Sequence, residues 1–279
     1  MGVPAPRALQ DRLPCQKKSI LCVMDNGKAE NVAAGSLTRK IYQELRADII
    51  RCRLPPGERL RIATLQDRFD TSLSAVREAL SRLSSEGFVV ATDQRGFRVA
   101  SVSPEDLEDL VRTRRRIEAV ALRQAIEIGD PEWEAAASAA YADLVRQDQR
   151  AGPEYTTDLQ WVAAHERFHH CLIIGCKSYW LTSICGQLAE RTQRYRYLAA
   201  AVPPNRDGPA EHRAIFNAVL ARDADRAVAL LDAHFAETAR RLIEAYSKAE
   251  RGKTVAADAN SGASKRKSRS KKMNTDTLS

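Results

Sequence analysis

Four of the five histidines in this 279-residue chain are spaced as the ligands of one metal ion could be. His165 and His169 lie four residues apart, so they share one face of a helix. His212 lies eleven residues before Asp223, and His234 lies eleven residues after it. If the flanking segments form antiparallel helices that turn near Asp223, these two side chains reach the same height. Two histidines from one helix and one from each of two others can surround a divalent ion inside a helical bundle.

The same segment allows a second interpretation. His165 and His169 enclose Glu166 in the His-Glu-x-x-His pattern of zinc-dependent hydrolases, in which the glutamate is the general base. The pattern needs a third ligand, for which Glu190 lies at a suitable distance, but the neighbours of Glu190 do not match the second hydrolase motif. A metal-dependent hydrolase is therefore kept as the alternative function. His170 points off the shared face and is predicted to be a bystander.

A site of three or four histidines leaves coordination positions of the metal open, so we expect an effector pocket beside it. Arginine is the natural partner of a carboxylate, because its planar fork matches the two oxygens. Arg194 and Arg196 are candidates for this contact. The predicted effector is therefore a small carboxylate.

Residues 54–99 have the order of elements of a winged helix-turn-helix: turn, short helix, tight turn, longer helix, two-stranded ribbon. Apolar residues mark one face of each helix. They are Ile62, Leu65 and Phe69 in the first helix, and Val76, Leu80 and Leu83 in the second. Ser72 is placed to cap the start of the second helix, and Gly87 suits a left-handed residue at its end.

Another face of the second helix carries small hydroxyl groups and one arginine. Its residues are Ser74, Arg77, Ser81 and Ser84. Such a face can enter a major groove, where an arginine pairs bidentately with guanine. We therefore expect Ser72, Ser74 and Arg77 to contact DNA. The tip of the ribbon, with Arg95 and Gly96, can enter a minor groove or touch phosphate.

The formal net charge of +8 is distributed unevenly. Residues 36–102 carry +4, whereas residues 103–250 carry −4. The two ends are basic, with +2 in residues 1–35 and +6 in residues 251–279, and we predict that both are disordered. The basic tail either adds non-specific phosphate contacts or is only a solvated tail. Positive charge thus gathers on the predicted DNA reader and at the ends.

Residues 103–250 show helical periodicity and no strand signal. The six expected helices cover residues 104–128, 131–149, 155–174, 178–200, 206–221 and 224–249. The predicted fold class is mainly α, with a winged helix-turn-helix over 36–102 and a six-helix bundle over 103–250 that binds the effector and dimerises. The six cysteines lack Cys-x-x-Cys spacing and no apolar run approaches a membrane span, which favours a cytoplasmic protein with reduced thiols.

The N-terminal segment resembles the GntR family of bacterial transcription regulators. The matching motifs are Pro56-Gly57-Glu58-Arg59-Leu60, Ser72, Val76-Arg77-Glu78-Ala79-Leu80, Gly87-Phe88-Val89 and Arg95-Gly96. Leu73 stands where the family usually has a base-contacting arginine, and Ala75 stands where it usually has proline. The resemblance implies that Leu73 faces DNA, whereas its spacing suggests the core, and both interpretations remain open.

The rest of the chain resembles the FadR-type branch of that family, whose C-terminal helical ligand-binding domain is called FCD. The family's Asp-x-x-x-His and two further histidines correspond here to His169, His212 and His234, with His165 in place of the aspartate. This replacement favours zinc or nickel over manganese. The resemblance also places Arg114 in the ligand cavity, through the pattern Arg114-Arg-Arg-Ile-Glu118.

Together these features predict a metabolite-responsive transcription regulator rather than an enzyme. We expect a cytoplasmic, nucleoid-associated homodimer that binds a pseudo-palindromic double-stranded DNA operator and acts as a repressor. A small carboxylate bound near the metal is expected to modulate that binding. Resemblance to the carbon-starvation regulator group implies a glutarate-like dicarboxylate.

Overall fold

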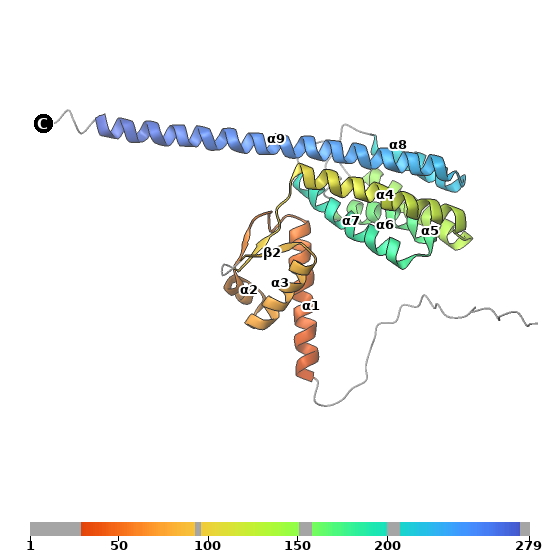
Figure 1. The fold of residues 1–279 in the computed structure, drawn as a ribbon, viewed down its shortest axis with the longest axis horizontal. Coiled ribbons are helices and arrows are strands. Elements are labelled where there is room, and N and C mark those ends of the chain that lie inside the picture. Colours follow the sequence, from red (N-terminus) through yellow and green to blue (C-terminus); the bar gives the residue numbers. More distant parts are fainter. Residues whose placement is uncertain (1–28, 93–95, 151–157, 200–206, 274–279) are drawn as a thin grey trace, which may run out of the picture.

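The chain folds into two domains, each with its own apolar core. The computed structural model describes residues 29–92, 96–150, 158–199 and 207–273, with side chains between residues 37 and 248 of these ranges. Figure 1 shows a small N-terminal domain below one end of a bundle of helices. The mainly α fold class predicted from the sequence is confirmed.

The helices of the C-terminal domain lie close to their predicted positions. In the described chain the helices are α1 (Ala29–Ile50), α2 (Ile62–Phe69), α3 (Leu73–Ser85), α4 (Pro104–Ile128), α5 (Pro131–Arg150), α6 (Leu159–Ile173), the short 3-10 helix η2 (Ile174–Cys176), α7 (Tyr179–Leu198), α8 (Gly208–Leu220) and α9 (Ala224–Met273). The strands are β1 (Arg59–Leu60), β2 (Val89–Thr92) and β3 (Gly96–Val99). The predicted start of α6, at residues 155–157, lies outside the described residues.

The N-terminal domain is a winged helix-turn-helix with α1 packed against α3. The Ser72 hydroxyl caps α3 by accepting a hydrogen bond from the backbone N–H of Ala75 at 3.4 Å. Gly87 ends the helix with φ of +74°, in the left-handed region that glycine adopts without strain. The ribbon formed by β2 and β3 is not a two-stranded unit. It is part of a three-stranded antiparallel sheet of order β1-β3-β2. β1 has only two residues, too few for an alternating pattern to reveal it.

The C-terminal domain is a bundle in which α4 packs against α7 and α9, α5 against α6, and α8 against α9. Its helices begin at side-chain caps. Before α4, the Ser103 hydroxyl accepts a hydrogen bond from the N–H of Asp106 at 3.2 Å. Asp158 caps α6 and Asp207 caps α8 in the same way. These caps set where α6 and α8 begin, and so where their histidines lie.

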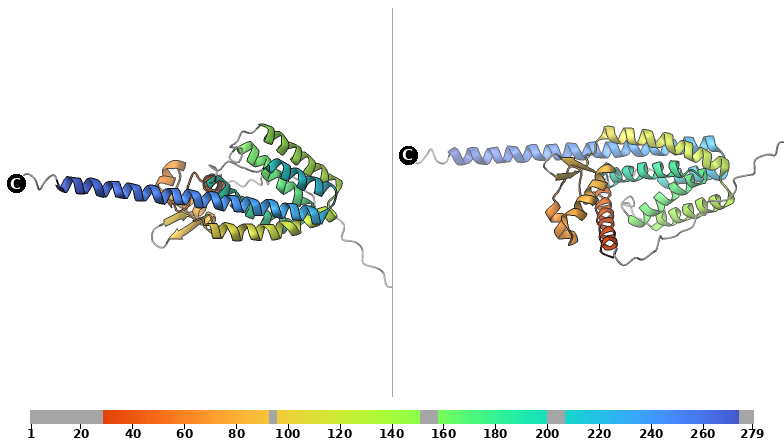
Figure 2. Two further views of the ribbon diagram at one scale, coloured as in Figure 1. Left: turned by 90° about the horizontal axis from the view of Figure 1, so that it is seen from above. Right: turned by 60° about the horizontal axis from the view of Figure 1, so that its bottom comes forward.

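The described helices extend into both ends for which the sequence predicts disorder. α1 begins at Ala29, before residue 36, and α9 continues through Met273. Residues 249–273 contain no proline and several alanines and lysines, which permits the helix to continue. Figure 2 shows α9 lying alongside α4 and then projecting past the N-terminal domain. Residues 1–28 and 274–279 lie outside the described residues.

The four described cysteines are free thiols. They are Cys52, Cys171, Cys176 and Cys185. Among the described residues, no helix combines the length and the apolar character that a membrane span requires.

Candidate functional site

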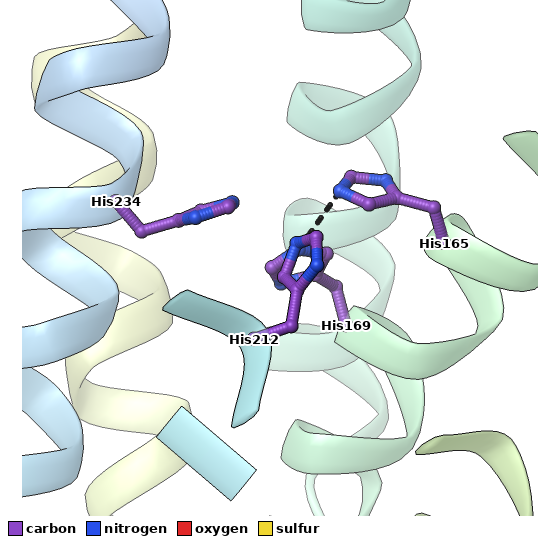
Figure 3. A group of neighbouring side chains, drawn as sticks. All are labelled: His165, His169, His212 and His234. Carbon is purple, nitrogen blue, oxygen red and sulfur yellow. Dashed lines mark hydrogen bonds between the residues drawn. The ribbon is translucent and has the colours of Figure 1, made fainter. Parts of the chain in front are cut away.

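The four predicted histidines come together inside the C-terminal bundle. His165 and His169 project from α6, His212 from α8 and His234 from α9, and Figure 3 shows their rings pointing toward one another. One ring nitrogen of each can be chosen so that all four lie within 4.8 Å of one another. The side chains are only 3–5% exposed. The helix turn at Asp223 thus brings residues 22 positions apart to one point, as its symmetric placement predicts.

The ring nitrogens of the four histidines would have to move slightly closer together to bind one metal ion. The Nε2 atoms of His165 and His169 lie 3.2 Å apart. A tetrahedral site with metal–nitrogen bonds of roughly 2.1 Å separates its ligand atoms by about 3.4 Å. The widest separation in the cluster, 4.8 Å, must therefore shorten by about 1.4 Å around such an ion.

Neighbouring groups orient the histidine rings. Nδ1 of His234 donates a hydrogen bond to Oε2 of Glu211 at 2.9 Å, which turns Nε2 of that ring toward the cluster. The indole of Trp161 stacks on the ring of His165, with centroids 4.7 Å apart. A carboxylate that fixes the tautomer of a histidine is the usual support of a metal ligand. Nδ1 of His169 has no hydrogen-bond partner among the described residues.

Burial keeps His165 and His169 of the cluster uncharged. Desolvation lowers the pKa of both His165 and His169 well below the ordinary value, and the positive charge of Arg196 acts in the same direction. Neutral imidazole is the form that binds a metal. The cluster can therefore accept a divalent cation without first releasing protons from these two rings.

A cavity of about 370 Å³ opens beside the histidines. Its walls include His165, His169 and two arginines, Arg114 from α4 and Arg196 from α7. Nε of Arg114 donates to Oε1 of Glu118 at 2.6 Å, and both side chains are buried. The guanidinium of Arg114 also lies over a phenyl ring. Arg114 and Arg196 therefore both line the cavity. Glu118 also lines it, and its position four residues after Arg114 on the same helix could have revealed this pairing.

Arg194 does not lie at this cavity, which corrects its prediction as an effector contact. It is buried, and its guanidinium donates to the backbone carbonyl of Ala100 at 2.6 Å. The reason is helical geometry: Gln193 and Arg196 are three residues apart and share the cavity face, whereas Arg194 lies about 100° around the helix from Gln193. His170 lines the cavity wall but is not part of the histidine group.

Glu190, the possible third ligand of a hydrolase, is also outside the histidine group. Its carboxylate accepts two hydrogen bonds from Arg46 of α1, one of them at 2.9 Å. Nε of Arg46 reaches Oε2 of Glu86 at 3.2 Å. Next to Glu190 on α7, Arg191 donates to the backbone carbonyl of Glu86.

These contacts make α7 the helix that joins the two domains. One face of α7 lines the histidine cavity, and the next face carries Arg191 and Arg194 against the N-terminal domain. Glu190 lines the cavity and also binds Arg46 of that domain. Sequence patterns did not reveal this role. Arg46 and Glu190 are 144 residues apart, and only the packing of the domains brings them together.

The predicted DNA-reading residues lie on an exposed face of α3. Ser72, Ser74 and Arg77 are all exposed, and the Ser72 and Ser74 hydroxyls lie 2.9 Å apart. Leu73 is 48% exposed at the first turn, so it lies on the exposed side of the helix and not in the core. Gly96 begins β3 with φ of +94°, whereas Arg95 at the wing tip lies outside the described residues.

The two domains together define a class of protein, a DNA-binding transcription regulator with a helical effector domain. The profile described as bacterial regulatory proteins, gntR family, matches residues 37–99, and that of the FCD domain matches residues 109–237. The chain belongs to the GntR family and carries a C-terminal FCD domain.

Two relatives of this chain are also described as HTH-type transcription regulators. BphR of Paraburkholderia xenovorans (strain LB400), described as an uncharacterized HTH-type transcriptional regulator, is 41% identical over 71% of this chain and 82% of its own length. The HTH-type transcriptional repressor GlaR of Escherichia coli (strain K12) is 34% identical over 69% of this chain and 90% of its own. The families and relatives are regulators and not enzymes, so the hydrolase alternative is wrong.

A solved structure shares the fold. E. coli McbR/YncC superposes with a TM-score of 0.63 over 75% of this chain and 98% of its own, at 22% sequence identity. The arrangement of a winged helix followed by a helical bundle is therefore found in a known protein of low sequence identity.

Proposed function

We propose that this regulator binds zinc or nickel through four histidines and that a small carboxylate bound beside the metal changes its affinity for an operator. One observation carries the proposal: four buried histidines lie together, and two of them, His165 and His169, border a single cavity with two arginines. In this proposal the protein is a cytoplasmic, nucleoid-associated homodimer of the FadR type and acts as a repressor. Ser72, Ser74, Arg77, Arg95 and Gly96 form its DNA contacts.

The four ligands proposed are His165, His169, His212 and His234. All are nitrogen donors, which suit zinc and nickel better than harder ions that prefer oxygen. Because neutral imidazoles leave the double positive charge of the ion uncompensated, the bound metal would act as a Lewis acid for an anionic oxygen in the cavity. Glu211 would hold His234 in the required tautomer.

A carboxylate is the effector class that this cavity favours. Arg114 is already paired with Glu118, so its remaining guanidinium nitrogens and Arg196 are the groups proposed to receive the effector. Two positive groups and an ion in one cavity favour two acidic groups over one. A dicarboxylate such as glutarate, expected of the carbon-starvation group, is a suitable candidate for a cavity of about 370 Å³.

Helix α7 is the proposed route from effector to DNA. Arg196 and Gln193 line the cavity, while Glu190 holds Arg46 of the N-terminal domain. A shift of α7 on effector binding would therefore move α1, and with it the packed helix α3. In a dimer, such a movement changes the spacing of two DNA-reading helices, and with it operator affinity.

A thermal-shift screen of the zinc-loaded protein against acetate, glutarate and citrate tests this proposal. Glutarate at 100 times its dissociation constant is expected to stabilise the protein by about 2.7 kcal/mol and to raise Tm by several degrees. It should also alter operator binding in a gel-shift titration. The proposal fails if no carboxylate distinguishes the zinc-loaded protein from the metal-free one.

A further inference from the structure

A second cavity, of about 440 Å³, lies between the two domains. Its walls come from α1 and the residue after it, from α6 and from α7. It shares Glu166, Glu190 and Gln193 with the histidine cavity, but none of the four histidines lines it. Its volume is in the range of small-molecule sites, which also occur preferentially at domain interfaces.

Three side chains that can donate hydrogen bonds line this cavity: Arg51, Gln193 and Tyr197. Gln193 is 5% exposed, and its amide Nε2 has no hydrogen-bond partner among the described residues. Burial raises the pKa of the Tyr197 hydroxyl, while Arg51 and Gln193 beside it act in the opposite direction. A buried amide nitrogen without a partner has lost its bonds to water, so an acceptor in the cavity would restore a favourable contact.

The charged groups in the wall balance one another. Arg46 donates two hydrogen bonds to Glu190. The wall contains two arginines, Arg46 and Arg51, and two glutamates, Glu166 and Glu190. Its formal charge therefore does not exclude an anion.

The remaining wall is largely apolar. Ala47 and Ile50 contribute from α1, and Leu159, Val162 and Ala163 contribute from α6. The ring of Tyr42 adds an aromatic surface. An occupant of this cavity therefore needs a hydrocarbon body that packs on the apolar wall. It also needs a group that only accepts hydrogen bonds, and an ionised carboxylate is such a group.

We propose that the interdomain cavity is a second ligand site, for a small carboxylate with an apolar body, which Arg51, Gln193 and Tyr197 hold by its acidic group. Its occupant contacts α1 of the N-terminal domain and α6 and α7 of the C-terminal domain at once. Binding therefore fixes the relative position of the two domains. This site does not need the metal, which separates it from the proposed effector site.

Equilibrium dialysis of benzoate against the full-length protein, stripped of metal with a chelator, tests the proposal. We expect one benzoate per chain, and unchanged binding in His212→Ala, which alters the histidine cluster and not the interdomain cavity. Arg51→Ala and the nearly isosteric Gln193→Leu should each weaken benzoate binding about tenfold or more. Benzamide, which has the same shape without the charge, should bind at least tenfold more weakly than benzoate.

Arg39→Ala is the matched control, because Arg39 is an exposed arginine of α1 that does not line the cavity. It should bind benzoate as the wild type does. The proposal is overturned if metal-free protein binds no benzoate, if Arg51→Ala and Arg39→Ala bind it equally, or if benzamide binds as tightly. Loss of benzoate binding in His212→Ala would also overturn it, by assigning the ligand to the histidine cavity.

Discussion

The face of α3 proposed to read DNA and the histidine cluster are opposite kinds of site. The first is exposed and comes from one short segment, whereas the second is buried and comes from three helices. An exposed site on one helix needs only the right residues at helical spacing. A buried site needs the helices to pack in register as well, so its residues depend on caps, turns and supporting hydrogen bonds.

This difference predicts how the two sites respond to mutation. A change on the exposed face should alter DNA binding and leave folding and metal content intact. A change beside the buried cluster should alter metal binding through the orientation of a ring, even where the altered residue is not itself a ligand.

The largest effect on the exposed site is expected from Arg77→Ala. Loss of a bidentate contact to a base should weaken specific operator binding by about 1–3 kcal/mol, roughly 5-fold to 150-fold. Gel-shift titration on operator and on random DNA measures it. Arg116→Ala removes an equal charge from the exposed surface of α4 and should change neither affinity. Equal losses on both DNAs would show that Arg77 contacts only phosphate.

Glu211→Gln tests the support of the buried site. Removing the negative charge beside Nδ1 of His234 should weaken metal binding about 10-fold to 100-fold without removing a ligand. Competition with a zinc chelator measures the affinity, and operator binding serves as the folding check. Glu132→Gln, an exposed glutamate of α5, should bind zinc as the wild type does. If the two variants have the same zinc affinity, Glu211 does not support the site.

The local features were predictable from the sequence, and the contacts between distant residues were not. Ser72 and Asp223 reveal helix boundaries through nearby backbone bonding, and the turn at Asp223 brings His212 and His234 together. The orientation of Arg194 and the pairing of Arg46 with Glu190 depend on how the two domains pack. Neither periodicity nor spacing carries that information.

His165→Asp should have a smaller effect, because it exchanges one ligand for another. The variant is expected to retain a metal, with its zinc affinity reduced less than in Glu211→Gln and its preference shifted toward manganese. Elemental analysis after loading with equal zinc and manganese measures the shift. His165→Ala is the matched control and should lose affinity for both ions. An unchanged metal ratio in His165→Asp would remove His165 from the ligand set.

The smallest effect is expected from the basic end of α9. Deleting residues 251–279 removes a charge of +6 and should lower the salt dependence of DNA binding while leaving operator preference unchanged. Affinities measured at several salt concentrations give the slope. Deletion of residues 274–279 alone removes no lysine or arginine and is the control. Equal slopes for the two truncated proteins and the full chain would show that this end does not reach DNA.

The metal content of the purified protein tests the central claim most directly. After loading with zinc or nickel and dialysis, elemental analysis should find one ion per chain in the wild type and in His170→Ala, and almost none in His212→Ala and His234→Ala. All four proteins should still bind the operator, because the winged helix holds none of the ligands. A wild type that retains no metal, or a His170→Ala protein that loses as much as His212→Ala, would contradict the four-histidine site.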